Sequence, residues 1–84
     1  MPYSLFLKNT AVKSINKLSA KDKEKIAKVL ESLRVNPFSG KKLAGEFKDF
    51  YSVRVWPYRT IYTIIKKELV VLVVDVTHRQ EVYK

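Results

Sequence analysis

The alternation of apolar and polar side chains is clearest over residues 51–65. Because successive side chains of a strand point to opposite faces, Tyr51 shares one face with the valines at 53 and 55, and Ser52 and Arg54 take the other. The Trp-Pro pair after residue 55 interrupts the ladder, since proline donates no backbone hydrogen bond. The alternation resumes at residue 58. The pattern predicts a hairpin with Arg54 and Arg59 on either side of its turn.

Residues 3–8 alternate in the same way and predict a short first strand, with Pro2 at its start. Two helices are then expected, because apolar residues recur three and four positions apart. Asn9-Thr10 is the expected cap of the first helix and Ser19 that of the second, which stops before Pro37. The apolar seam of this helical hairpin comprises Ala11, Ile15, Leu18, Ile26, Val29, Leu30 and Leu33.

The second half of the chain begins with a long loop over residues 36–45, which holds both glycines. We expect Phe38 and Leu43 to attach this loop to the core. A turn at residues 66–68 precedes an almost wholly apolar strand over residues 69–77, which is expected inside the sheet with both faces covered. Residues 78–84 are expected to form a polar tail.

The order of elements is therefore a strand, two helices and three antiparallel strands, which indicates an α+β fold. We expect the N-terminal strand and the helical hairpin to pack on a small, mostly antiparallel sheet. No repeat or linker divides the chain, so residues 1–84 are read as a single domain. The sheet face or edge away from the helices is left for a ligand, and there the hairpin and the tail are expected to meet.

Composition narrows the chemistry. The chain has no cysteine and one histidine, which excludes disulfides, thiolate metal sites and multi-histidine metal sites. No apolar run suits a signal peptide or a membrane span, so a soluble cytoplasmic protein without membrane association is expected.

The net charge of the chain indicates the kind of partner that it binds. Seventeen Lys and Arg residues against eight Asp and Glu residues give a net charge of +9 on 84 residues. Such an excess favours a polyanionic partner, foremost nucleic acid, although a basic surface also serves solubility alone. Composition does not separate RNA from DNA.

The candidate site residues are Arg54, Arg59, His78, Arg79 and Tyr83. No Ser/His/Asp arrangement, phosphate-cradling glycine loop or carboxylate pair accompanies them. Arginine, histidine and tyrosine suit metal-free RNA cleavage, in which the 2′-OH attacks and the enzyme stabilises charge and moves protons. The plainer interpretation is that the arginines extend along a hairpin edge, the histidine lies on the surface and the tyrosine packs on the sheet.

The chain also resembles the RelE/ParE toxin superfamily, and the RelE-type mRNA interferases in particular. The resemblance runs nearly end to end. It is carried by the Tyr-x-Leu-x-Leu opening, the helical hairpin, Asn36-Pro37…Gly40…Lys42-Leu43-x-Gly45, Tyr51-Ser-Val-Arg54-Val, Tyr58-Arg59-x-Ile61-Tyr62 and His78-Arg79-x-Glu81-Val82-Tyr83.

The resemblance implies a twisted antiparallel sheet with an N-terminal helical hairpin. It also implies a toxin of a type II toxin–antitoxin system: an endoribonuclease that needs no metal or other cofactor, cuts mRNA in the ribosomal A site and so inhibits translation. Its partners would be the ribosome and a cognate antitoxin, which forms a hetero-oligomer with the toxin. Because the chain is basic, that antitoxin is expected to be acidic.

The resemblance also implies residue roles. Arg59 would contact the scissile phosphate, Arg54 would bind RNA from the central strand, and Arg79 would stabilise the transition state. Tyr83 would stack on the mRNA or help to activate it, and His78 would act as acid or base.

One position departs from the superfamily pattern. Some members carry a lysine, a candidate general base, where this chain has Ser52, whose neutral hydroxyl is a poor base. Ser52 supports one alternative, a catalytically inactive member that binds RNA or protein. A ParE-type inhibitor of DNA gyrase also stays open, although such an inhibitor has no need to keep Arg54, Arg59, Arg79 and Tyr83 together.

Overall fold

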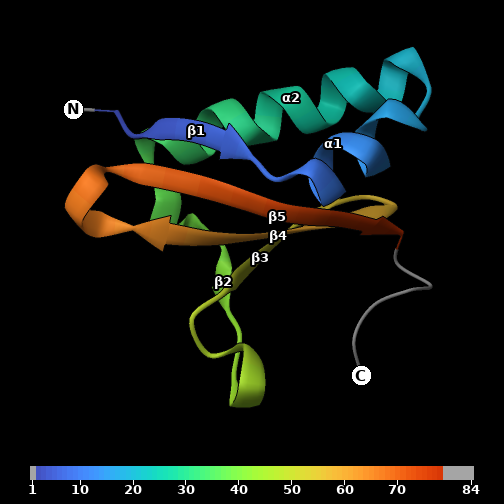
Figure 1. Cartoon of the computed structure of the whole chain (residues 1–84). Helices are drawn as coiled ribbons and strands as arrows, with labels where there is room; N and C mark the ends of the chain where they lie inside the picture. The colour runs from blue at the N-terminus through green and yellow to red at the C-terminus, as the bar shows by residue number, and fades with distance from the viewer. Residues whose placement is uncertain (1, 79–84) are drawn as a thin grey trace.

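The computed structural model describes residues 2–78. Two helices pack on one five-stranded sheet, as Figure 1 shows, so the expected α+β fold is confirmed. In chain order the elements are β1 (Ser4–Leu7), α1 (Asn9–Asn16), α2 (Ala20–Val35), β2 (Lys41–Lys42), β3 (Tyr51–Val55), β4 (Tyr58–Ile65) and β5 (Val70–His78). Neither helix has the length and apolarity needed to cross a membrane.

The strands follow the order β1-β5-β4-β3-β2. Only β1 and β5 run parallel, and the three other pairings are antiparallel. The apolar strand β5 lies between β1 and β4, which confirms its expected interior position, but the helices cover only one of its faces and Leu72 and Val74 on it are half-buried. It starts at Val70, one residue later than predicted, because Leu69 has a φ of 54° and is 45% exposed.

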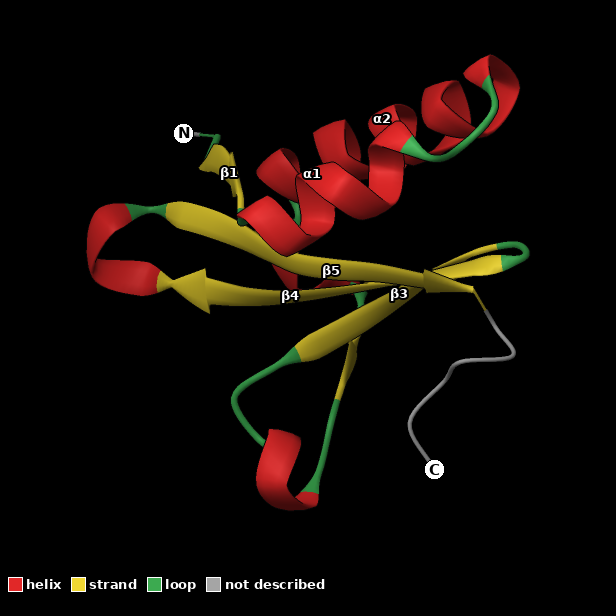
Figure 2. Cartoon of the chain, turned by 45° about the vertical axis from the view of Figure 1, so that its right-hand side comes forward, coloured by secondary structure: helices red, strands yellow, loops and turns green. Residues whose placement is uncertain are grey.

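The helices cover one face of the sheet, and Figure 2 shows the segment that contains β2 extending to the other side. Their apolar seam meets the inward side chains of β4 and β5 to form the core. The largest fully buried side chains in it are Tyr62, Ile26, Leu33, Val71, Val73 and Thr60. The predicted helical seam is thereby confirmed at its centre, while Val29, Ile15 and Leu18 are half-buried at its margin.

Of the two predicted helix caps, one is confirmed and one is wrong. The Ser19 hydroxyl accepts a hydrogen bond from the backbone N–H of Asp22 at 3.2 Å, as a capping residue does. The first helix instead starts at Asn9 with Lys8 as its N-cap, and no side chain caps it. The Thr10 hydroxyl donates to the carbonyl of Val74 in β5, so a tertiary contact takes the group that the sequence suggested as a cap.

The predicted long loop is more regular than expected. Short 3-10 turns at Pro37–Ser39 and Gly45–Phe47 flank the two-residue strand β2. Leu43 is half-buried, but the expected attachment through Phe38 is wrong, because this ring is 47% exposed. It lies edge-on to the Tyr51 ring, with the Lys66 ammonium 5.5 Å from its centroid.

Tyr62 makes the attachment that Phe38 does not. Its side chain is fully buried, and its hydroxyl donates to the Pro37 carbonyl at 2.7 Å and accepts from the Gly40 N–H at 3.1 Å. A Cβ on residue 40 would lie 2.3 Å from the Tyr62 hydroxyl and 2.9 Å from the Ser52 carbonyl oxygen. Only glycine fits there, and the close approach fixes the start of β2 against the sheet.

Replacing Tyr62 by phenylalanine tests this attachment. Tyr62→Phe leaves the buried Pro37 carbonyl and the part-buried Gly40 N–H without their partner, so we expect the free energy of unfolding to fall by about 1–3 kcal/mol. The matched control is Tyr51→Phe, because the half-buried Tyr51 hydroxyl makes no hydrogen bond among the described residues. Urea titrations would measure both variants, and an equal loss in both would contradict the role of the Tyr62 hydroxyl.

The pH dependence of stability gives a second test of the same group. Burial raises the pKa of Tyr62, against a smaller lowering by the hydrogen bond from Gly40. The unfolded chain ionises this phenol near pH 10, so it binds fewer protons than the folded chain above that pH. The stabilisation is therefore complete below pH 10 and is lost as the pH rises towards the folded pKa. Wild type should lose stability above pH 10 more steeply than Tyr62→Phe, and parallel curves would contradict this.

Candidate nucleic-acid interface

The two arginines of the central hairpin lie directly opposite each other. Arg54 of β3 is the cross-strand partner of Arg59 of β4, one pair beyond the Val55–Tyr58 pair that closes the hairpin. On β3, Val55 belongs to the core under the helices, and Tyr51 and Val53 pack against it. By alternation Arg54 and Arg59 take the opposite face, as the sequence predicted.

A groove of about 400 Å³ lies on this face. Both arginines line it, together with Ser52 from β3 and with Gly40 and Lys41 from the segment that Tyr62 holds. Arg54 is exposed and Arg59 is half-buried. No acidic side chain is among the described residues that line the groove, so its polar lining offers cationic and neutral donors.

The acidic side chains that form ion pairs lie elsewhere. Within residues 2–78 the three ion pairs are Lys25–Asp22, Lys28–Glu24 and Arg34–Glu31, all on α2. Neither guanidinium of the hairpin is in an ion pair with a described residue. Like charges directly opposite each other on a sheet repel, so the pair of arginines is poised to take up an anion.

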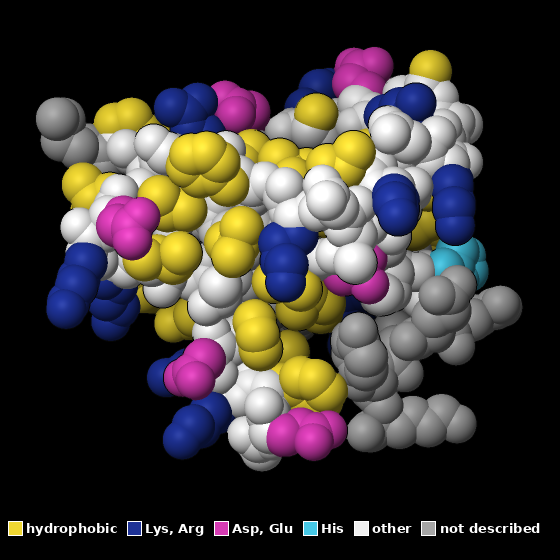
Figure 3. Space-filling view, viewed as in Figure 1, with side chains coloured by type: hydrophobic (Ala, Val, Ile, Leu, Met, Phe, Trp, Pro, Cys, Tyr) yellow, Lys and Arg dark blue, Asp and Glu magenta, His cyan; other side chains and the backbone are white. Residues whose placement is uncertain are grey.

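Basic side chains are also spread over other parts of the surface. Figure 3 shows lysine and arginine side chains at several separate places on the face it presents, with hydrophobic side chains between them. The net charge of +9 therefore does not come from the groove alone. What distinguishes the groove is the pairing of two arginines on rigid strands.

Ser52 is buried, with 6% of its surface exposed. It pairs with Ile61 of β4 on one side and with Lys41 of β2 on the other. This buried serine therefore contributes a small neutral group to the lining of the groove.

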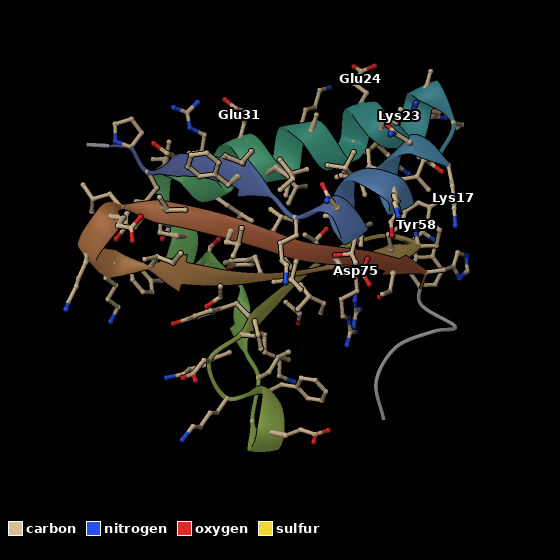
Figure 4. All side chains as sticks on the ribbon, viewed as in Figure 1. Lys17, Lys23, Glu24, Glu31, Tyr58 and Asp75 are labelled. Atoms are coloured by element: carbon tan, nitrogen blue, oxygen red, sulfur yellow. The ribbon has the colours of Figure 1, made fainter. Side chains whose placement is uncertain are left out.

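His78 lies apart from the arginines. It is the cross-strand partner of Tyr58, whereas Arg59 pairs with Thr77. The imidazole stands edge-on to the Tyr58 ring with centroids 5.7 Å apart. The Tyr58 hydroxyl donates to Asp22 of α2 at 2.8 Å, so the Tyr58 side chain lies on the side of the sheet that the helices cover (Figure 4). The structure thus does not bring His78 together with Arg54 and Arg59, and its catalytic role stays a prediction.

A shift in strand register explains this separation. On β5 the inward side chains are Val71 and Val73 and then Val76, because the pairing shifts by one residue beside Ile61 and Tyr62. One extra residue in a strand reverses which side chains face inward beyond it. Simple alternation along the sequence would have put His78 on the face of the arginines.

The same neighbourhood affects Tyr58. The hydrogen bond to the Asp22 carboxylate raises the pKa of the Tyr58 phenol, with smaller contributions from burial and from the charge of Asp22. The phenol therefore stays protonated at neutral pH and acts as a donor to α2. This arrangement ties the hairpin to the helices and leaves Tyr58 engaged on the side opposite the groove.

The other predicted site residues, Arg79 and Tyr83, lie outside the described residues. Sequence reasoning missed Gly40 and Lys41 as lining residues, because a two-residue strand is too short for alternation to reveal it. The part of the chain that the structure describes contains no group of three or more residues suited to hold a metal ion.

A comparison with family models identifies the family of this chain. Residues 5–83 match a family model described as the ParE toxin of the type II toxin–antitoxin system parDE. A comparison with curated proteins found no match.

Solved structures are similar over nearly the whole chain. The RelBE2 toxin–antitoxin complex of Mycobacterium tuberculosis contains a chain with 27% identity and a TM-score of 0.87, matched over 94% of this chain and 100% of that one. The isolated Escherichia coli RelE toxin has 29% identity and a TM-score of 0.78, with 90% and 83% covered. The archaeal RelE–RelB complex of Pyrococcus horikoshii has 24% identity and a TM-score of 0.81, with 98% and 100% covered, which shows the shared fold.

The opposed arginines give a prediction about stability. Because Arg54 and Arg59 repel each other across the strands, Arg54→Gln and Arg59→Gln should each raise the free energy of unfolding by about 0.2–1 kcal/mol at low salt. Added salt should shrink the gain, since it screens exposed charges.

The control for this prediction removes a lysine that does have a partner. Lys28 is 3.5 Å from Glu24 on α2, and Lys28→Gln should give no gain in stability. Denaturant titrations at two salt concentrations would measure all three variants. A loss of stability in both arginine variants would mean that these side chains hold the hairpin together.

Proposed function

Since this chain belongs to the ParE toxin family of type II toxin–antitoxin systems, within the RelE/ParE superfamily, we propose that it is an endoribonuclease that cuts mRNA in the ribosomal A site. The observation that carries the proposal is the pair formed by Arg54 and Arg59, opposed on rigid strands, without acidic partners among the described residues, over an open groove. A surface that only binds protein has no need to hold two guanidinium groups against each other.

The pair suits an RNA phosphate. Each guanidinium presents a planar fork of donors that matches two phosphate oxygens. In the proposed reaction the 2′-oxygen attacks the phosphorus and the 5′-oxygen leaves, which produces a 2′,3′-cyclic phosphate and a 5′-hydroxyl end. Charge builds up on the phosphate oxygens in the transition state, where donors fixed in advance stabilise it most. Arg59 and Arg54 would hold the phosphate, with Arg79 as the third arginine.

The proposed cleavage also requires two proton transfers, which groups other than the arginines would carry out. One proton leaves the 2′-hydroxyl and one joins the departing 5′-oxygen. Ser52 is neutral and buried at the groove floor, and His78 faces the helix side beside Tyr58. In the proposal Tyr83 and groups of the ribosome therefore move the protons, or Tyr83 stacks on a base and the ribosome acts alone.

The antitoxin partner follows from the family, since the similar solved structures include toxin–antitoxin complexes. With a charge of +9 on the toxin, the antitoxin in this proposal carries acidic segments, and one of them neutralises the arginine pair. The toxin would act in the cytoplasm, where mRNA and ribosomes are.

Inhibition of DNA gyrase is the second candidate. The family model that matches residues 5–83 is described by the name ParE, and the neutral Ser52 in place of a lysine is compatible with a member that cuts no RNA. A supercoiling assay with purified gyrase separates this candidate from the first.

Primer extension on an mRNA in a translating extract tests the proposal. We expect cuts inside the reading frame that appear only when ribosomes are present. Arg59→Gln should lower the cutting rate by about 100-fold or more, the usual effect of losing a donor that stabilises transition-state charge.

The matched control is Lys28→Gln, which removes the same charge from α2 and should cut at the rate of wild type. Folded protein that leaves the mRNA intact with ribosomes present would overturn the nuclease proposal. Inhibition of supercoiling by that same protein would then establish the second candidate.

A further inference from the structure

We propose that Lys41 is the third cation of the groove and binds the RNA phosphate next to the one that the arginines hold. This inference rests on the proposed function and deepens it, because it assigns a substrate contact to a residue that alternation along the sequence does not reveal. Lys41 would be a binding and positioning residue for a single RNA strand.

The sheet register places Lys41 on the correct face. It is the cross-strand partner of Ser52, and Ser52 precedes Arg54 by two positions on the same strand. Cross-strand partners share a face, as do residues two apart, so Lys41, Ser52 and Arg54 project to the same side. The exposed Lys41 accordingly lines the same groove as both arginines.

The backbone that carries Lys41 is held on both sides. On one side the Gly40 N–H donates to the buried Tyr62 hydroxyl at 3.1 Å, and the residue fits there because it has no side chain. On the other side the Leu43 N–H donates to the Phe50 carbonyl at 2.9 Å. An ammonium group on a fixed backbone loses less freedom on binding than one on a mobile loop.

The local charges favour an anion at Lys41. The described lining of the groove includes no carboxylate, and Lys41 takes part in none of the ion pairs among residues 2–78. Its cross-strand neighbour Ser52 is small and neutral, so Lys41 is the residue of this pair that brings a positive charge to the groove. A lysine ammonium binds phosphate as a compact point charge, which complements the bidentate guanidinium groups.

The next residue provides a matched control. Lys42 has the same charge and is also exposed, but its cross-strand partner is Tyr51, so it projects to the opposite face. It lines a separate pocket of about 260 Å³ with Tyr51 and Lys66. Substituting Lys41 or Lys42 thus makes the same change in net charge on opposite sides of one short strand.

The experiment compares Lys41→Gln with Lys42→Gln in binding a 2′-O-methylated single-stranded RNA, which lacks the attacking hydroxyl and cannot be cut. Fluorescence anisotropy at several salt concentrations gives the affinity and its salt dependence. One phosphate contact on a single strand contributes a slope of about 0.7 in log K against log salt, so Lys41→Gln should lower that slope by about 0.7 and the affinity at 0.1 M salt by about fivefold. Lys42→Gln should stay within about twofold of wild type, and Lys41→Arg should bind like wild type.

Equal behaviour of the two glutamine variants would overturn the role of Lys41, as would wild-type protein that does not bind the oligonucleotide. Primer extension in the translating extract separates this inference from the proposed function. In-frame cutting by wild type, with equal rates in both variants, would overturn the role of Lys41 alone. Binding that depends on Lys41 in a protein that cuts no mRNA would overturn the nuclease proposal and leave Lys41 as part of an RNA-binding groove.

Discussion

The hydroxyl of Tyr62 is the contact on which the site depends. It lies inside the core, yet it bonds to the Pro37 carbonyl and to the Gly40 N–H, which belong to the segment that forms the edge of the sheet. The Phe38 ring, which is half exposed, does not provide such a contact with the core. With the Tyr62 contact, a two-residue strand pairs with β3 and completes one side of the groove. A single buried phenol therefore connects the packing of the helices to the position of the basic side chains.

The charged side chains of α2 and those of the hairpin affect stability in opposite ways. The acidic side chains of α2 form ion pairs along their own helix, where the gain in stability is small. The hairpin arginines face each other without such a partner among the described residues, which costs stability. Proteins commonly accept such a cost where a ligand is bound. The cost would be relieved when a phosphate, or an acidic segment of the antitoxin, takes up the position between the two guanidinium groups.

The register shift beside Ile61 and Tyr62 decides which side chains can work together. Beyond it, β5 turns Val76 and His78 towards the helices, although a regular strand would have turned them away. His78 consequently packs against Tyr58, which donates to Asp22, whereas Arg54 and Arg59 line the groove on the opposite face. A displacement of one residue therefore puts the imidazole of His78 on the other face of the sheet from Arg59, although His78 pairs with the neighbouring Tyr58.

The sequence by itself determined the helical seam, the Ser19 cap, the hairpin and the opposed arginines, because helix periodicity, strand alternation and the effect of proline act between residues close in the chain. Only the tertiary structure decided the pairing of β2, the attachment by Tyr62, the helix-side position of His78 and the place of Lys41 beside Ser52. Those features arise from hydrogen bonds and packing between distant segments. Alternation of side chains cannot be detected in a strand of two residues. A register shift is defined by the pairing of two strands, so it cannot be recognised from the sequence of one strand alone.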